Sequence, residues 1–411
     1  MEKLNFRTYD SEHDKDTVHR IWKEIGWVEG DNYAAMDIDI EGNRTIVVDI
    51  NGQPECLAES VEGNIDYLGE RLPFSAIAAI TVSLVARKQR LALRSTAKLL
   101  ALDVAEGAAV AGLGIFDQGF YNKVGFGNGS NINLYRISPA SLMVDTSSRI
   151  PIRLNKDDWE RVFEVRQRHI RCHGSICLTK PFHTRAEISS ENASFGLGYS
   201  NDQGKLTHLM WLHGLGTENG PYRVYWMAYE NWDGFVELLG LLKSFGDQIN
   251  LVILPEPPGV QLQDFLDRPF YHRNITAKSA NENTCKAMAF FQWRILDLQK
   301  CLAKTHLPGE AVKFNLRLSD PVAKYLDADE PWQGVGGEYV VTLGEESVAK
   351  RGVDKSLETL ECSVNAFTRL WLGNLSAASL RFSDDFKASD TLVNKLDQLI
   401  RLPIPQPDWM F

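Results

Sequence analysis

The stretch that decides the fold joins an apolar run, AIAAITVSLV at residues 76–85, directly to a basic segment, ARKQRLALR at residues 86–94. The apolar run is rich in Ala, Ile and Val, which predicts a buried strand. Residues 87–106 contain no Gly or Pro, and apolar residues recur at spacings of four, three and four from Leu93 to Val104. This periodicity predicts an amphipathic helix directly after the strand. A strand-to-helix turn presents free N–H groups and the positive end of the helix dipole, which suits a pyrophosphate.

Positive charge gathers at the start of this predicted helix, at Arg87, Lys88, Arg90 and Arg94. On a helix, Arg87, Arg90 and Arg94 would share one face. Cations at a helix N-terminus are unfavourable by about 0.3–1 kcal/mol each, and a bound polyanion would reverse that sign. A solvated basic face explains the charge equally well, so charge alone leaves both interpretations open.

A second signal, FYNKVGFG, begins at Phe120, thirty residues after Arg90. The pair of signals resembles the GNAT superfamily of N-acetyltransferases, in which an acyl-CoA loop of the form Arg-Arg-x-Gly-x-Ala follows a strand and precedes Tyr-x-x-x-Gly-Phe/Tyr-Gly. In its order the chain is most similar to the Eis-like (enhanced intracellular survival) branch, whose members are multi-acetylating enzymes acting on amines. The resemblance extends over nearly the whole chain. It implies acetyl transfer from acetyl-CoA, the co-substrate, to a primary amine of the aminoglycoside, polyamine or lysine type.

The resemblance also implies an α/β (α+β) fold with tandem GNAT-like domains, built on mixed twisted sheets, and a sterol-carrier-type α+β domain at the C-terminus. We expect these domains at residues 1–147, 148–288 and 289–411. The likeness to the third domain is carried by Trp293 to Asp297 and by Leu370 to Gly373.

Local signals support this order of elements. Asn51-Gly52 between apolar runs predicts a tight hairpin. Asn231 or Asp233 can cap a helix. The strand predicted at Leu251 to Leu254 stops at Pro255, which cannot continue a central strand.

The resemblance assigns cofactor contacts by position. Main-chain groups of Ile80 and Val82 would pair with the pantetheine arm as an added strand pairs with a sheet edge. Cations and amides of the basic segment would hold the pyrophosphate. The full set expected to bind the cofactor is Ile80, Val82, Arg87, Lys88, Arg90 and Asp117.

Two groups are expected to move protons. Tyr121, at the family's Tyr position, would be the general acid that protonates the departing coenzyme A thiolate; without the resemblance, an aromatic anchor in the core is the better interpretation. The resemblance also implies that the main-chain carboxylate of Phe411 acts as the base, because only a neutral amine can attack a thioester. The pKa of a free α-carboxyl is only about 3.3–3.7, so it would work through desolvation, a water relay or electrostatic anchoring.

The last residues favour a buried end. Pro403, Pro405 and Pro407 restrict the chain before Trp409-Met410-Phe411, an apolar terminus. A hydrophobic clasp that only joins the domains is the alternative interpretation.

The sequence departs from the family pattern in three places. Arg90 stands where the acyl-CoA loop has Gly, Leu84 where Pro is usual, and Phe116-Asp117 where a Ser-Glu pair is typical. Gly serves at such turns because the backbone approaches phosphates closely. These departures motivate the alternative of a catalytically degenerate GNAT-fold protein with a binding or regulatory role.

Acceptor contacts are expected from the first helices, and Trp27 and Asp31 are the residues chosen, because an aromatic wall beside a carboxylate suits a cationic amine. The cluster His169-x-x-Cys172-His173-x3-Cys177 lacks a CxxC pair, so no metal is expected. A lipid carrier based on the C-terminal domain is a third, weaker hypothesis.

Net charge, the longest apolar run and the cysteine content limit the classes of partner and compartment. The 411 residues carry a formal net charge of −10, which argues against a nucleic-acid partner. The longest apolar run, residues 74–86, is too short to cross a bilayer, and six scattered cysteines form no disulfide framework, so we expect a cytoplasmic protein without a membrane partner. The resemblance implies a homo-oligomer, a hexamer.

Overall fold

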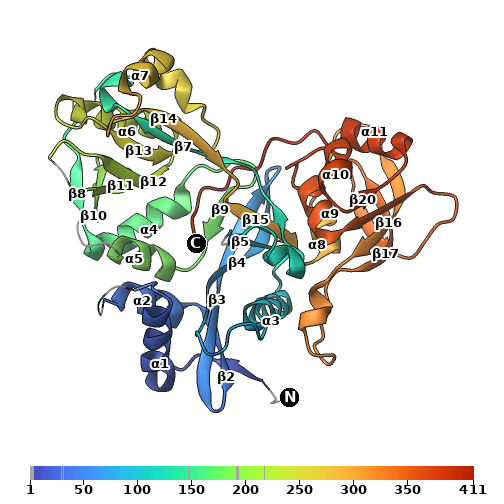
Figure 1. Ribbon diagram of the computed structural model, residues 1–411. Helices are drawn as coiled ribbons and strands as arrows, with labels where there is room; N and C mark the ends of the chain where they lie inside the picture. The colour runs from blue at the N-terminus through green and yellow to red at the C-terminus, as the bar shows by residue number, and fades with distance from the viewer. Residues whose placement is uncertain are drawn as a thin grey trace.

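The computed structural model describes residues 4–28, 30, 32–115, 117–146, 149–190, 194–216 and 218–411. It is a mixed α/β structure with three sheets, of eight, seven and five strands. Figure 1 shows an N-terminal lobe in blue, a central lobe in green and yellow, and a C-terminal lobe in orange and red, with the chain end lying where the first two lobes meet.

The eight-stranded sheet forms the N-terminal lobe. Its order is β1-β2-β3-β4-β5-β15-β6, and β9 pairs with β3 beyond this path. The strands are β1 (Asn5–Thr8), β2 (Arg44–Ile50), β3 (Gln53–Tyr67), β4 (Glu70–Val82), β5 (Val110–Gly114), β6 (Gly127–Asn128), β9 (Ile176–Leu178) and β15 (Phe291–Ile295). Its helices are α1 (Ser11–Glu24), α2 (Ala34–Gly42) and α3 (Leu91–Ala105), followed by the short 3-10 helix η1 (Tyr121–Val124). The predicted hairpin is confirmed, since Asn51 and Gly52 join β2 to β3 with φ of 53° and 76°.

The seven-stranded sheet forms the central lobe, in the order β14-β7-β13-β12-β11-β10-β8. The strands are β7 (Ile132–Ile137), β8 (Ile152–Leu154), β10 (Ser194–Ser200), β11 (Leu206–Gly214), β12 (Tyr222–Tyr229), β13 (Val252–Pro255) and β14 (Thr284–Met288). The helices are α4 (Trp159–Arg168), α5 (Phe182–Ser189), α6 (Trp232–Ser244) and α7 (Pro269–Thr276). Asn231 caps α6 as predicted, because its side chain accepts from the Gly234 N–H at 2.9 Å.

The five-stranded sheet forms the C-terminal lobe, in the order β18-β17-β16-β19-β20. Its strands are β16 (Val312–Ser319), β17 (Gly337–Leu343), β18 (Val348–Arg351), β19 (Thr359–Ser363) and β20 (Phe386–Lys387). The helices are α8 (Leu298–Ala303), α9 (Val364–Trp371), α10 (Ala377–Ser383) and α11 (Asp390–Leu399). Further 3-10 turns are η2 (Pro139–Ser141), η3 (Lys156–Asp158), η4 (Phe245–Asp247), η5 (Leu262–Phe265) and η6 (Val322–Tyr325).

Strands cross the expected domain boundaries. β15, expected in the C-terminal domain, pairs with β5 and β6 in the first sheet. β7, expected in the first domain, pairs with β13 and β14 in the second. A Cβ on Gly112 of β5 would lie 2.5 Å from the Trp293 ring of β15, so this glycine is what lets the two strands meet.

The helix after β4 begins later than its sequence predicts. Lys88 and Arg90 have φ of 68° and 62°, which a right-handed helix excludes. Helix α3 therefore starts at Leu91, and only Arg94 of the basic residues lies on it. The predicted shared helical face of Arg87, Arg90 and Arg94 is wrong. Among the helices of the described residues, none is both long and apolar enough to pass through a membrane.

Candidate active site

The central feature of the N-terminal lobe is a fork between two parallel strands. β4 and β5 pair only from Phe74–Val110 to Ile77–Leu113. β5 then ends at Gly114, while β4 continues to Val82. Its last residues keep β3 on one side, and across the described residues no strand pairs with their other edge. Ile80 and Val82, the expected pantetheine contacts, are half-buried on this open stretch.

A bulge bends β4 at the fork. The β3–β4 register shifts between Leu57 and Glu59, and Ala79 has a φ of 48°. A bulge adds one residue to one strand and kinks it locally. The bulge therefore helps β4 to diverge from β5 at the point where a ligand could enter.

The basic loop follows the fork. Residues 87–90 are exposed, and within the described chain no hydrogen bond or ion pair reaches the side chains of Arg87, Lys88 or Arg90. Nor does any acceptor there bind the N–H groups of residues 87–93, since Arg90 supplies no side-chain cap and the first helical bond is Arg94 N–H to Arg90 O at 3.0 Å. Free amides beside three free cations form a suitable cradle for a polyanion.

Two neighbours hold this loop in place. The Leu84 N–H donates to the Glu24 carboxylate of α1 at 3.0 Å, which a Pro at position 84 could not do. Arg94 bonds to Asp327 of the C-terminal lobe at 3.2 Å, and Lys98 pairs with Glu330 there. Arg94 is thus occupied by protein, unlike the three cations before it.

Tyr121 lies just beyond the end of β5, in η1. It is 7% exposed and packs in a hydrophobic cluster that includes Ile77 and Leu113, the last residues paired across the fork. Burial, with a smaller contribution from the nearby Cys56 thiol, raises the pKa of Tyr121 above its ordinary value of 10. The phenol therefore keeps its proton at neutral pH.

The glycines that follow Tyr121 are required by the C-terminal lobe. Gly125 has a φ of 88°, and a Cβ there would collide with the Arg294 guanidinium. A Cβ on Gly127 would lie 2.7 Å from the Asn365 carbonyl oxygen. Arg294 is fully buried and pairs with Asp320 at 2.6 Å. The Tyr-x-x-x-Gly-Phe-Gly segment is thus also a docking point between lobes.

The chain end reaches the mouth of the fork. The Phe411 ring packs against Phe74 of β4 and Phe291 of β15, with centroids 5.8 and 5.4 Å apart. A Cβ on Gly114, the last residue of β5, would lie 3.5 Å from a main-chain oxygen of Phe411. Phe411 and Tyr121, 290 positions apart in the sequence, therefore both lie at the end of β5.

Gln406 and Asp408, close to the chain end, are tied to the segment that leads from α4 into β9. The Gln406 N–H donates to the His173 carbonyl at 2.8 Å, and the Ser175 hydroxyl donates to the Gln406 carbonyl at 3.1 Å. The Asp408 carboxylate accepts from the Ile176 N–H at 2.8 Å. These bonds attach the tail to the loop between α4 and β9.

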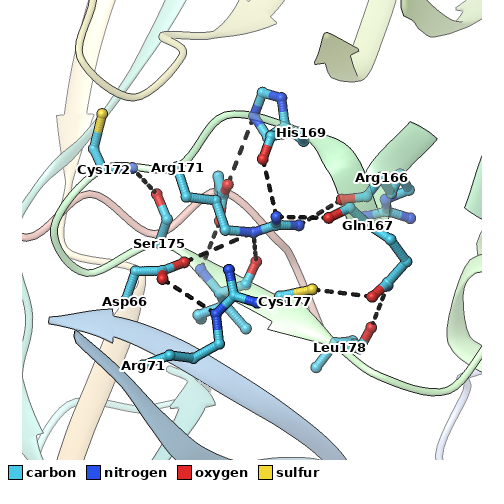
Figure 2. Close-up of polar contacts among 12 residues, drawn as sticks. Asp66, Arg71, Arg166, Gln167, His169, Arg171, Cys172, Ser175, Cys177 and Leu178 are labelled. Atoms are coloured by element: carbon cyan, nitrogen blue, oxygen red, sulfur yellow. Dashed lines mark hydrogen bonds and ion pairs between the residues drawn. The ribbon is translucent and has the colours of Figure 1, made fainter. Parts of the chain in front are cut away.

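Arg171 organises this loop (Figure 2). Its guanidinium bonds to the Gln167 and His169 carbonyls at 3.1 and 2.9 Å, and also to that of Arg166, so it caps the C-terminal end of α4. Arg166 in turn stacks over the Trp409 ring at 3.6 Å, and Trp409 is 3% exposed. The burial expected for the apolar terminus is therefore present at Trp409, whereas Met410 is 44% exposed.

The same loop contains the His169, Cys172, His173 and Cys177 cluster, where no metal is expected. Figure 2 shows Cys172 and Cys177 apart from each other, and the Cys177 thiol bonds to Gln167 at 3.3 Å. His173 contacts the Leu372 carbonyl at 2.9 Å. Over the described ranges, no three His, Cys, Asp or Glu side chains are grouped as metal ligands.

Asp408 gives a stability prediction. Burial raises its pKa from 3.8 to about 6, although Arg171 acts in the opposite direction. His169, 3.7 Å away, is no cation at neutral pH because burial lowers its pKa to about 4. An acid whose pKa is raised on folding destabilises the native state above that pKa, and this cost falls as the pH drops through about 6 towards 3.8.

Asp408→Asn should therefore raise the free energy of unfolding by about 1–2 kcal/mol at pH 8, with the gain disappearing near pH 4. Urea unfolding at both pH values measures this difference. An equal effect at the two pH values would contradict the account.

The remaining predicted contacts are less central. Trp27 follows α1 and is 48% exposed, while Asp31 lies outside the described residues. Asp117 is exposed in the turn before η1, where its carbonyl accepts from the Phe120 N–H at 3.1 Å. Within the described chain, the side chains of Trp27 and Asp117 form no hydrogen bond or ion pair with the residues of the fork.

A buried polar cluster beside the chain end was not predicted. His183 of α5 lies between Asp39 of α2 and the Met410 carbonyl. Glu59 of β3 is fully buried nearby, and the Asn43 side chain donates to it at 2.9 Å.

Solved structures share this fold over the whole chain. A GCN5-related N-acetyltransferase from Anabaena variabilis matches with 100% of both chains covered, 14% identity and a TM-score of 0.79. Eis1 from Mycobacterium abscessus matches with the same coverage, 14% identity and 0.75, and a probable N-acyltransferase from Enterococcus faecalis with the same coverage, 16% identity and 0.77. No family model and no curated protein matches the sequence. At such identities the likeness concerns the fold, and the predicted α/β fold with GNAT-like domains is confirmed.

Proposed function

We propose that the chain is an acetyl-CoA-dependent N-acetyltransferase that acetylates a primary amine of the aminoglycoside, polyamine or lysine type. The observation that supports this proposal is that Tyr121 and a Phe411 main-chain oxygen both lie next to the last residues of β5, where the β4–β5 fork opens. One group holds a proton at neutral pH and the other, as a carboxylate, can accept one. Amine acetylation needs both.

The donor would enter through the fork. The open edge of β4 at Ile80 and Val82 can pair with the amides of a pantetheine arm, as a strand adds to a sheet. The free amides of residues 87–93 and the cations Arg87, Lys88 and Arg90 fit the pyrophosphate. These amides and the three cationic side chains form no other hydrogen bond or ion pair in the described chain.

The proton transfers follow from these positions. The Phe411 carboxylate accepts the proton that the amine gives up as its nitrogen bonds to the acetyl carbonyl carbon. Tyr121 donates its proton to the sulfur as the carbon–sulfur bond breaks. The high pKa of Tyr121 keeps that proton available, and the buried tail fixes the acceptor of the first one.

Product formation tests the proposal. Purified protein with acetyl-CoA and a panel of polyamines, aminoglycosides and lysine peptides should release free thiol in an amine-dependent manner. No release above background with any amine on the panel would contradict it.

Arg90 is one of the three departures that motivate the degenerate alternative, and its φ of 62° marks a position that favours glycine. Arg90→Gly separates the two cases. For an active enzyme the variant loses a phosphate contact, and calorimetry should give a dissociation constant for acetyl-CoA about three- to tenfold higher. If Arg90 instead obstructs the loop, binding should tighten.

Arg90→Ala is the matched control. It removes the same charge but keeps a side chain in the left-handed region, so it should lose the same affinity. It should also be less stable than the Gly variant by about 1 kcal/mol or more.

We further propose that the C-terminal lobe, the expected sterol-carrier-type domain, supports the tail and the basic loop rather than carrying lipid. A cavity lined by Tyr67, Phe367, Leu370 and Trp371 has a volume of about 10 Å³, room for about one water molecule. Ligand sites are usually hundreds of Å³. The hexamer and the division into three domains stay predictions.

A further inference from the structure

His183 makes the last contact to the tail before Phe411. Its Nε2 lies 3.0 Å from the Met410 carbonyl oxygen, and its Nδ1 lies 2.9 Å from Asp39 Oδ2. The side chain is 7% exposed. The Met410 carbonyl belongs to the same planar peptide unit as the Phe411 nitrogen, so whatever holds this oxygen restricts where Phe411 can point.

The two partners decide the protonation state of His183. A main-chain carbonyl and an ionised carboxylate both only accept hydrogen bonds, so both ring nitrogens must carry protons. Burial alone would lower the pKa of His183, but Asp39, with smaller contributions from Glu187 and Glu59, raises it to about 10. The ring is therefore an imidazolium at neutral pH.

The groups around this imidazolium come from four elements. Asp39 faces it from α2, Glu59 from β3 and Glu187 from its own helix, α5. Glu187 is paired with Arg166 of α4. Burial and the charge of Asp39 raise the pKa of Glu59 well above its ordinary value, so Asp39 is the carboxylate that balances His183.

We propose that His183, held as an imidazolium by Asp39, is the positioning residue that fixes the last peptide unit of the tail and so directs the Phe411 carboxylate into the fork. The anchors at Gln406, Asp408 and Trp409 secure the tail upstream. None of these anchors holds the peptide unit between Met410 and Phe411. The Phe411 ring packs against Phe74 and Phe291, and the His183–Met410 bond fixes the main chain before it. The catalytic part of this inference rests on the proposed function.

A pair of substitutions separates the two bonds of His183. In His183→Gln the amide nitrogen can reach the place of Nε2 and still donate to Met410. In His183→Asn it reaches only the place of Nδ1 and Asp39. We expect kcat to stay within about threefold of wild type for Gln and to fall about 10- to 100-fold for Asn. The KM for acetyl-CoA should be unchanged in both, because the basic loop is intact.

A second measurement does not use acetyl transfer. Carboxypeptidase removes Phe411 only when the end of the tail detaches, so the rate of phenylalanine release reports how firmly the end is held. We expect release about 10- to 100-fold faster for His183→Asn than for wild type or His183→Gln. Asp39→Asn leaves the imidazole in place but removes the negative charge that pairs with it. This variant should also release phenylalanine faster than wild type.

Protonation makes a further difference between these variants. The stabilisation from His183 should be fully present below about pH 6.5 and lost as the pH rises through about 10. The difference in free energy of unfolding between wild type and His183→Gln should shrink over this range. Without the Asp39 charge the pKa of His183 is raised less. In Asp39→Asn the stabilisation from His183 should therefore be lost at a lower pH than in wild type.

The outcomes are distinguishable. Equal release rates and equal kcat for the Gln and Asn variants would overturn the positioning role, even if both fold with wild-type circular dichroism. If His183→Asn does not fold, the Asp39→Asn variant is the test. Release of phenylalanine from Asp39→Asn at the wild-type rate would overturn the positioning role of His183. If the proposed function is wrong, no variant transfers acetyl, yet the release rates still differ.

Discussion

Adding one glycine after Phe411 should lower kcat by about 1000-fold or more, within the range attributed to a positioned general base. The extension replaces the Phe411 carboxylate by a neutral peptide carbonyl and moves the negative charge one residue onward. A main-chain oxygen of Phe411 lies near Gly114 at the mouth of the fork, where there is no reason for a displaced carboxylate to meet the same amine. Thiol release under saturating acetyl-CoA and amine measures the effect.

A matched control is Met410→Leu, since this side chain is 44% exposed and the change leaves the terminal carboxylate and the Met410 carbonyl in place. It should retain wild-type kcat. Activity of the extended chain within threefold of wild type would remove Phe411 from the mechanism and leave the tail as a clasp between lobes.

Tyr121→Phe should lower kcat by about 100-fold while the dissociation constant of acetyl-CoA stays the same. The variant removes one oxygen from a side chain that is 7% exposed in a packed cluster, so its ring should keep its position. The lost proton donor matters only as sulfur departs, which is why the effect should appear in kcat. Because burial raises the Tyr121 pKa above 10, wild-type activity should show no loss from tyrosine ionisation below that pH.

Tyr135→Phe provides the control, because Tyr135 is equally buried but lies on β7 of the second sheet. It should not change kcat. Equal activity of wild type and Tyr121→Phe with a slow acceptor, for which chemistry limits the rate, would show that Tyr121 is only a core aromatic.

Local patterns predicted much of the fold. The order of strand, basic turn, helix and Tyr121 is present, as are the Asn51-Gly52 hairpin and the Asn231 cap. Each of these depends on residues close in the sequence, where spacing and backbone preference act directly. The predicted helix start was wrong because the prediction used the absence of Gly and Pro. That absence gives no sign that Lys88 and Arg90 adopt positive φ.

Long-range pairing could not be predicted in this way. β15 lies about 180 residues after β5 in the sequence but pairs with it in the first sheet. This pairing requires that Gly112 has no side chain where the Trp293 ring packs. The His183–Asp39 pair joins residues 144 positions apart. A single histidine after Phe182 carries no signal of a buried partner on another lobe. Contacts of this kind arise from packing and become visible only in the folded chain.

The most direct test of the account is a crystal structure with coenzyme A bound. We expect the pantetheine arm along residues 80–82, the pyrophosphate on the amides of residues 87–93, and the thiol sulfur about 3–3.5 Å from the Tyr121 hydroxyl. The Phe411 carboxylate should face the same sulfur from the acceptor side of the fork. Coenzyme A bound away from the β4–β5 fork, or a thiol remote from both groups, would contradict the account.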